Sequence, residues 1–213
     1  MLFPADLHNI AGDKVPPGMS VRPAQADSVA AKRALRAHLR AARDALTPDE
    51  RGTLVEQARS YLNQCDAWRS ARVIASYLPH QSEFDPYFLT QEARERNVKV
   101  VYPRVEGKNL SFREWQAGDA TETTIGNVLQ PAEAAPAVAT ADIDLFITPL
   151  LGCGASGIRL GYGGGFYDRV FADTSGFRLG VGFAIQRVTD WQTEPHDQAL
   201  DGFLSEAGLT LFT

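Results

Sequence analysis

The chain has 213 residues, of which 44% are hydrophobic and 22% charged, with a formal net charge of −5. A chain of this length can bury about 70% of its unfolded surface in one core, which predicts a single globular domain. The mild acidity argues against nucleic acid as a partner, because such an interface needs a basic stripe. It does not exclude an anionic small molecule, which needs only local positive charge.

Two cysteines, Cys65 and Cys153, lie far apart in the sequence. They are too few for a disulfide scaffold and lack zinc-ligand spacing, so we interpret them as free thiols in a reducing compartment. The N-terminus has neither the basic region nor the apolar run of a signal peptide. No segment reaches the apolar length of a membrane span. We therefore expect a soluble, cytoplasmic protein without a membrane partner.

The N-terminal third of the chain is predicted to be an extension followed by helices. Residues 1–27 contain prolines and glycines without periodicity and are expected to be poorly ordered, ahead of one domain over residues 28–213. A helix is predicted from Ser28 to Leu46, and a second from the capping pattern Thr47-Pro48-Asp49-Glu50 to Gln64. The first helix carries a basic column beside an apolar stripe of Leu35, Leu39, Ala42 and Leu46: Lys32, Arg36 and Arg43.

Strands and helices alternate along the rest of the chain. The predicted strands are residues 72–78, 98–102, 110–115, 144–151, 178–184, 203–205 and 209–212, and further helices start at Asp85 (to about Asn97) and at Phe166. Residues 117–141 are small, polar and rich in alanine and proline, and are expected to form a long surface loop. This alternation predicts an α/β layered fold with a mostly parallel sheet.

The stretch RLGYGGGFYDR, residues 159–169, has four glycines in five positions. It lies between an apolar strand and a helix, beyond the strand's carboxyl end, where open α/β sheets bind ligands. Glycine lets backbone N–H groups approach phosphate oxygens, and the following helix N-terminus adds partial positive charge. Arg159 and Arg169 are candidate phosphate partners, and Asp168 is a candidate magnesium ligand.

The alternative is a glycine-rich turn that only packs the helix against the strand. The stretch lacks the lysine of a Walker A loop. It also lacks the G-x-G-x-x-G order of a dinucleotide-binding loop. On the residues alone, both interpretations stay open.

The segment GIRLGYGGGFYDR, residues 157–169, resembles the signature of the 5-formyltetrahydrofolate cyclo-ligase family, also called 5,10-methenyltetrahydrofolate synthetases. Four other segments resemble elements of the family, in the family's order over about residues 28–206: AKRALR (31–36), YLPHQSEFD (77–85), VYPRV (101–105) and EPHDQALDGFLSE (194–206). The resemblance implies a three-layer α/β/α sandwich with a mostly parallel sheet, similar to the sugar-phosphate isomerase and CoA-transferase group.

The resemblance also implies an activity, the ATP- and Mg²⁺-dependent conversion of 5-formyltetrahydrofolate to 5,10-methenyltetrahydrofolate with release of ADP and phosphate. The formyl oxygen would attack the γ-phosphate, N10 would attack the resulting iminium carbon, and phosphate would leave. No covalent enzyme nucleophile is needed, so positioning and charge neutralisation should supply most of the catalysis. The expected partners are these two small molecules, and the chain is expected to be a monomer.

Site residues follow from the same resemblance. It implies catalytic cations at Lys32, Arg36 and Arg159, and an ATP site that adds Leu160, Gly161, Tyr162, Gly163, Gly164, Gly165, Phe166 and Tyr167. It implies substrate contacts at Leu78, Glu83, Tyr162 and Phe166, and metal ligands at Asp168 and Asp197. Position 166 is more often tyrosine in the family. Some members carry Arg and Lys where Tyr162 and Gly164 stand. In this chain, neutralisation of the phosphate charge would therefore depend more on Lys32, Arg36 and Arg159.

Each role has a plainer alternative. The basic column could be a solvated helix face, and Glu83 a cap or a surface acid before the helix at Asp85. Asp168 could be an acid in the first turn of its helix, and Asp197 a loop acid. At the level of function, the alternatives are a folate-sequestering protein without turnover and a different sugar-phosphate or kinase-like enzyme on the same sandwich. The tryptophans are expected to pack rather than to contact a cofactor: Trp68, Trp115 and Trp191.

Overall fold

The computed structural model describes residues 25–124, 126–189, 191, 194 and 197–212. An eight-stranded sheet runs through its centre in the order β12-β11-β10-β7-β1-β2-β3-β6. The inner strands pair in parallel: β1 (Val73–Ala75), β2 (Lys99–Glu106), β7 (Leu145–Thr148), β10 (Phe177–Val181) and β11 (Gly202–Ser205). The remaining strands pair antiparallel: β3 (Asn109–Glu114), β6 (Ala137–Val138) and β12 (Gly208–Leu211). The predicted mostly parallel sheet is confirmed.

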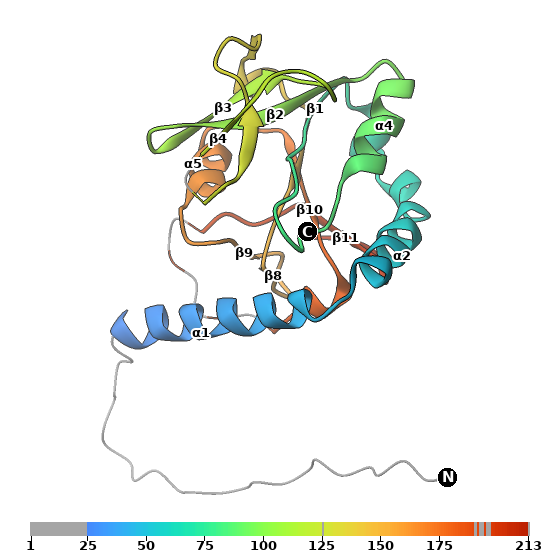
Figure 1. The fold of residues 1–213 in the computed structure, drawn as a ribbon. Coiled ribbons are helices and arrows are strands. Elements are labelled where there is room, and N and C mark those ends of the chain that lie inside the picture. Colours follow the sequence, from blue (N-terminus) through green and yellow to red (C-terminus); the bar gives the residue numbers. More distant parts are fainter. Residues whose placement is uncertain (1–24, 125, 190, 192–193, 195–196, 213) are drawn as a thin grey trace, which may run out of the picture.

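Helices cover both faces of this sheet (Figure 1). One layer holds α2 (Pro48–Arg59), η1 (Leu62–Gln64), α3 (Asp66–Ser70) and α4 (Tyr87–Glu95), and the other holds α5 (Phe166–Ala172). Side chains alternate between two cores: Ile74 and Val100 pack under α2–α4, whereas Ala75 and Val101 pack under α5. This alternation with a period of two gives the expected three-layer sandwich.

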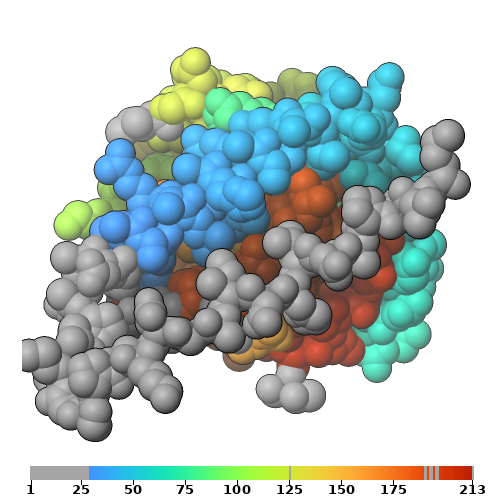
Figure 2. All heavy atoms as spheres, turned by 90° about the horizontal axis from the view of Figure 1, so that it is seen from below, coloured from blue at the N-terminus to red at the C-terminus, as the bar shows by residue number. Residues whose placement is uncertain are grey.

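The first helix, α1 (Gln25–Asp44), begins at Gln25 rather than at Ser28. Residues 1–24 of the expected extension lie outside the described residues. The predicted apolar stripe faces inward, with Leu39 only 2% exposed. Seen from below, α1 and α2 form one band across the molecule, against segments of the C-terminal half (Figure 2). Among the residues that the structure describes, no helix is both long and apolar enough to cross a lipid bilayer.

Three predicted strands are shorter than expected, among them β10, which covers residues 177–181 rather than the predicted 178–184. The β1 strand covers residues 73–75 of the predicted 72–78, and β7 covers 145–148 of the predicted 144–151. Pro149 follows β7 and cannot donate a ladder hydrogen bond, so the strand ends there. The chain then forms an antiparallel hairpin of β8 (Gly152–Cys153) and β9 (Arg159–Leu160), which leads into the glycine loop. Cys65 and Cys153 are both buried.

The prediction that residues 117–141 form a long surface loop is wrong. The segment contains an antiparallel hairpin of β4 (Thr121–Thr123) and β5 (Leu129–Pro131), followed by β6 and by the 3₁₀ turns of η2 (Thr140–Asp142); η3 (Ala184–Gln186) follows later in the chain. Gln130 and Pro131 are buried. Strands of two or three residues are too short to show a hydrophobic period, so the composition alone suggested a loop.

The start of α2 forms the predicted capping box. Glu50 N donates to Thr47 Oγ1 at 3.3 Å, and Thr47 N donates to Glu50 Oε2 at 2.8 Å. Thr47→Ala should lower the free energy of unfolding by about 1 kcal/mol in urea denaturation, because the cap oxygen is lost. Thr53→Ala removes a hydroxyl that bonds Asp49 O within the same helix and should cost less than about 0.5 kcal/mol. Equal losses in the two variants would contradict the role of the cap.

Candidate active site

A cavity of about 610 Å³ lies where α1, the loop after β1, β2, the β4–β5 hairpin and the glycine loop meet. Its wall contains every residue that the resemblance assigns to ATP, substrate or metal: Lys32, Arg36, Leu78, Glu83, Arg159, Leu160, Gly161, Tyr162, Gly163, Gly164, Gly165, Phe166, Tyr167, Asp168 and Asp197. The fold brings together residues as distant as Lys32 and Asp197, which are 165 positions apart. This shared wall is compatible with a single binding site, whose ligands have to be inferred.

The glycine loop, residues 161–165, adopts a backbone that side chains would strain. Gly163 and Gly165 have φ angles of 100° and 63°, in the left-handed region that glycine tolerates. Gly165 is also the N-cap of α5, which has only seven residues. The dipole of so short a helix is small, so side chains rather than the helix terminus would have to balance most of the charge of a bound anion.

Two ion pairs hold the acids assigned to the metal. Lys32 Nζ lies 3.0 Å from Asp197 Oδ2 and 3.4 Å from Glu194 Oε2. Arg159 Nη2 lies 3.2 Å from Asp168 Oδ1. Arg159 is 8% exposed, and its Nε atom is buried without a hydrogen-bond partner among the described residues. Arg159 also lines the cavity, so its guanidinium is suited to binding an anion there.

Asp168 and Asp197 are the metal ligands that the resemblance implies. Within the described ranges there is no group of three or more His, Cys, Asp or Glu side chains that could hold a metal ion. Asp168 and Asp197 do line the same cavity. Two carboxylates suit Mg²⁺, which usually takes one or two of them together with phosphate oxygens and water. The residues present therefore fit a magnesium ion that is bound together with a nucleotide.

The basic column of α1 turns toward the glycine loop. Arg36 Nε donates to the carbonyl oxygen of Gly161 at 2.9 Å. Arg43, which is 1% exposed, donates to the hydroxyls of Tyr162 at 2.9 Å and Ser82 at 3.0 Å. A fully buried guanidinium is not part of a solvated face, so that alternative is wrong for Arg43. The spacing of the column was visible in the sequence, but the partner of Arg43 was not.

Tyr162 connects the glycine loop to Glu83. The tyrosine hydroxyl donates to Glu83 Oε1, and Glu83 Oε2 accepts from His80 N at 2.9 Å. At the start of α4, the Asp85 side chain accepts a hydrogen bond from Tyr87 N at 2.9 Å. Glu83 is therefore not the helix cap. Burial and the negative charge of Glu83 raise the pKa of Tyr162, and its phenol therefore stays a protonated donor at neutral pH.

Three features of this site differ from the predictions. Trp191 lines the cavity, whereas Trp68 is buried and Trp115 packs edge-on against another ring. Arg169, predicted to contact phosphate, donates to the carbonyl oxygens of Lys108 at 2.8 Å and of Gly164 at 3.0 Å, and so braces the loop. The β4–β5 hairpin forms part of the wall. No local sequence signal indicated the direction of these side chains.

A three-layer α/β sandwich with a glycine loop and basic side chains on one cavity is typical of enzymes whose ligands carry phosphate. The family model described as the 5-formyltetrahydrofolate cyclo-ligase family matches residues 28–206. The chain therefore belongs to this family of ligases.

Relatives and solved structures point to the same family. The 5-formyltetrahydrofolate cyclo-ligase of Escherichia coli (strain K12) is 26% identical over 151 residues, which cover 68% of this chain and 83% of the relative. That of Mus musculus is 25% identical over 193 residues, covering 83% and 94%. The NMR structure of Aquifex aeolicus 5,10-methenyltetrahydrofolate synthetase is 25% identical with a TM-score of 0.73, covering 84% and 92%. The synthetase structure from Mycoplasma pneumoniae is 23% identical with a TM-score of 0.68, covering 82% and 98%, and shows likeness of fold.

Removing the hydroxyl of Tyr162 tests its connection to the buried arginine. Tyr162→Phe should lower the free energy of unfolding by about 1–3 kcal/mol, because Arg43 loses an acceptor while it stays buried. Tyr87→Phe removes a hydroxyl from a side chain that is 57% exposed and should change stability by less than about 0.5 kcal/mol. Urea denaturation of both variants measures the difference, and a Tyr162→Phe protein as stable as the control would contradict this assignment.

Proposed function

We propose that this chain catalyses the ATP-dependent cyclisation of 5-formyltetrahydrofolate to 5,10-methenyltetrahydrofolate, with release of ADP and phosphate. One observation carries the proposal: a single cavity is lined both by the glycine loop with its cations and by Leu78 and Glu83. The glycine loop and its cations suit a triphosphate, and the carboxylate of Glu83 suits a planar ring with N–H donors. The family to which the chain belongs supports the identity of both ligands.

The ATP end is proposed to be the glycine loop with Arg159, Lys32 and Arg36. The loop can present backbone N–H groups to phosphate oxygens because four of its five residues have no Cβ atom. Arg159 contributes a guanidinium that lines the cavity. Asp168 and Asp197 would hold Mg²⁺, which when bound neutralises charge on the phosphate oxygens.

The folate end is proposed to be Glu83 with the rings of Tyr162 and Phe166. A carboxylate can accept about four hydrogen bonds, and the bonds from Tyr162 and His80 use two of them. The rest can accept from the amino group and ring N–H of the pterin, a planar donor edge. Phe166 keeps an aromatic face for ring packing where the family more often has tyrosine.

The chemistry requires placement rather than a protein nucleophile. The formyl oxygen attacks the γ-phosphorus, an O–P bond forms, and the bond from phosphorus to ADP breaks. N10 then attacks the activated carbon and loses its proton, and phosphate departs with the former formyl oxygen. The side chains of Lys32, Arg36 and Arg159 stabilise negative charge on the transferring phosphoryl group. Glu83 fixes the pterin so that the formyl oxygen lies in line with the phosphate.

The decisive assay follows ultraviolet absorbance, since methenyltetrahydrofolate absorbs at longer wavelength than its 5-formyl precursor. Protein, Mg-ATP and 5-formyltetrahydrofolate should generate that band, and omission of ATP should abolish it. Tight binding of 5-formyltetrahydrofolate without the band would favour the sequestering alternative. The proposal also takes the chain to act as a cytoplasmic monomer on these two small molecules, with neither nucleic acid nor membrane as partner. A dimer in light scattering would contradict the monomer.

Asp168→Asn tests the ATP end. The variant should raise the KM for Mg-ATP by about 10-fold or more, since loss of even an indirect metal contact commonly costs that much. Binding of 5-formyltetrahydrofolate, followed by tryptophan fluorescence, should stay within about two-fold. Asp173→Asn, which alters an exposed acid just after the same helix, should change neither quantity. If Asp168→Asn weakened the binding of Mg-ATP and of 5-formyltetrahydrofolate equally, the assignment of Asp168 as a metal ligand would be wrong.

Glu83→Gln tests the folate end and should show the opposite pattern. Removing the charge weakens the hydrogen bonds to the pterin, and bonds to charged groups are worth about 1.5–3 kcal/mol. The KM for 5-formyltetrahydrofolate should therefore rise by about 10-fold or more, with little change in the KM for ATP. Initial rates at saturating levels of the other substrate give both constants. An unchanged folate KM would remove Glu83 from the site.

A further inference from the structure

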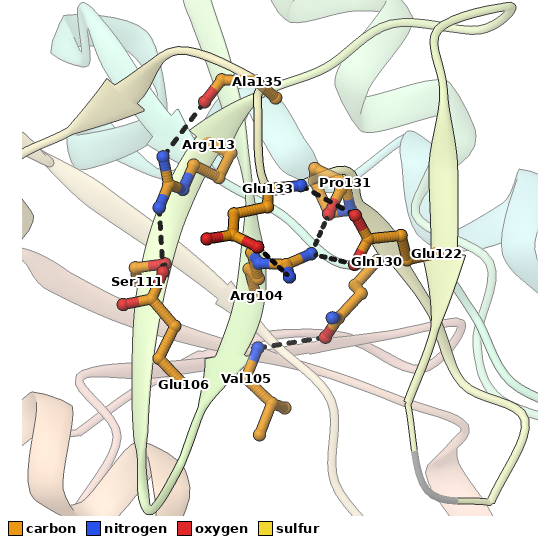
Figure 3. Close-up of polar contacts among 10 residues, drawn as sticks. All are labelled: Arg104, Val105, Glu106, Ser111, Arg113, Glu122, Gln130, Pro131, Glu133 and Ala135. Carbon is orange, nitrogen blue, oxygen red and sulfur yellow. Dashed lines mark hydrogen bonds and ion pairs between the residues drawn. The ribbon is translucent and has the colours of Figure 1, made fainter.

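The β4–β5 hairpin is fastened to the sheet by one buried arginine (Figure 3). Arg104, in the middle of β2, is only 9% exposed. Its Nη1 atom donates to Glu122 Oε2 at 2.7 Å and to the carbonyl oxygen of Pro131 at 2.8 Å. Glu122 belongs to β4 and Pro131 to β5, so a single guanidinium holds both strands of the hairpin.

Neighbouring contacts close this cluster. Arg104 Nη2 lies 3.8 Å from Glu133 Oε2, and Glu133 N donates to Glu122 Oε1 at 3.0 Å. Hydrogen bonds from Glu133 N–H and from Arg104 lower the pKa of Glu122, which therefore stays ionised at neutral pH. Val105 N donates to Gln130 Oε1 at 3.0 Å and adds a second connection to the sheet. The position of the hairpin is thus set by β2.

The hairpin also forms one side of the cavity. Its wall residues are Thr124, Val128, Leu129 and Gln130, and they face a cavity that is also lined by Val105 and Leu110. Leu129, one of these wall residues, is 50% exposed. An apolar side chain in such a place gains burial when an apolar ligand covers it.

We infer that the β4–β5 hairpin is the wall that holds the apolar middle part of the substrate, and that Arg104 is the positioning residue of this wall. The inference rests on the proposed function for the identity of that substrate, whose aromatic middle separates the pterin from the glutamate. Because its hydrogen bonds go to Glu122 and Pro131, Arg104 acts through the hairpin. Loss of this arginine should therefore weaken folate binding without disabling the phosphoryl transfer.

Arg104→Lys is the sharpest variant, because lysine keeps the charge but its freely rotating ammonium lacks the fixed, planar directions of the two Nη1 N–H donors that reach Glu122 and Pro131. We expect the KM for 5-formyltetrahydrofolate to rise by about 10-fold, while kcat and the KM for ATP stay within about two-fold. Arg113→Lys is the matched control. Arg113 lies on the adjacent strand β3 and bonds Ala135 O at 3.1 Å and Glu106 Oε1 at 2.8 Å (Figure 3). The control should leave all three constants within about two-fold.

Leu129→Ala tests the wall directly and leaves the arginine cluster intact. It should raise the KM for 5-formyltetrahydrofolate by about five- to ten-fold, the lower end of what lost apolar contacts cost. In the Arg104→Lys background the same change should cost about two-fold or less, because the hairpin is already displaced. Leu211→Ala, at a leucine that is 54% exposed on the edge strand β12, should have no effect.

The outcomes separate the two proposals. An active wild-type enzyme whose folate KM is unchanged in Leu129→Ala overturns the hairpin inference alone, as does an Arg104→Lys enzyme that loses kcat with its KM unchanged. A wild-type protein that neither binds nor converts 5-formyltetrahydrofolate overturns both proposals. If Arg104→Lys fails to fold, as judged by thermal unfolding, the comparison of Leu129→Ala with Leu211→Ala decides the question.

Discussion

The rest of the site depends on the docking of α1 against the glycine loop. A backbone with four glycines in five positions loses more conformational entropy on folding than the same length of chain with side chains at those positions. Arg36 restrains this loop through the carbonyl oxygen of Gly161, and Arg43 restrains it through the hydroxyl of Tyr162. Both contacts use acceptors of the loop, which leaves its backbone donors for a ligand. A helix from the N-terminal end of the domain thereby preorganises a loop more than a hundred residues away.

The charges of the site are balanced before any ligand arrives. Lys32 pairs with Asp197, and Arg159 pairs with Asp168. Both cations are nearly buried, and a buried charge without a partner is costly. In the proposed function, a nucleotide with its metal would offer each of these groups a replacement partner, phosphate oxygens for the cations and a cation for the acids. The exchange would leave no group buried and alone.

The sequence predicted features that are set locally and missed features that depend on tertiary contacts. The capping pattern at Thr47 and the column on α1 each lie within one helix, so spacing is sufficient to identify them. The hairpins β4–β5 and β8–β9 have strands of two or three residues, which carry no readable period. The direction of Arg169 and the meeting of Asp168 with Asp197 on one wall are set by contacts between distant segments. The family resemblance predicted that Asp168 and Asp197 lie in one site, whereas their spacing in the sequence did not.

The same kind of hydrogen bond occurs at several irregular parts of the cavity wall: an arginine side chain donates to a backbone carbonyl oxygen. Arg36 holds Gly161, Arg104 holds Pro131, and Arg169 holds both Gly164 and Lys108. Short hairpins and glycine turns form few ladder hydrogen bonds of their own, so a guanidinium takes the place of a neighbouring strand. The planar fork fixes direction as well as distance, which an ammonium group does not. Walls braced in this way keep their geometry without a ligand, and a site that acts by placement needs that property.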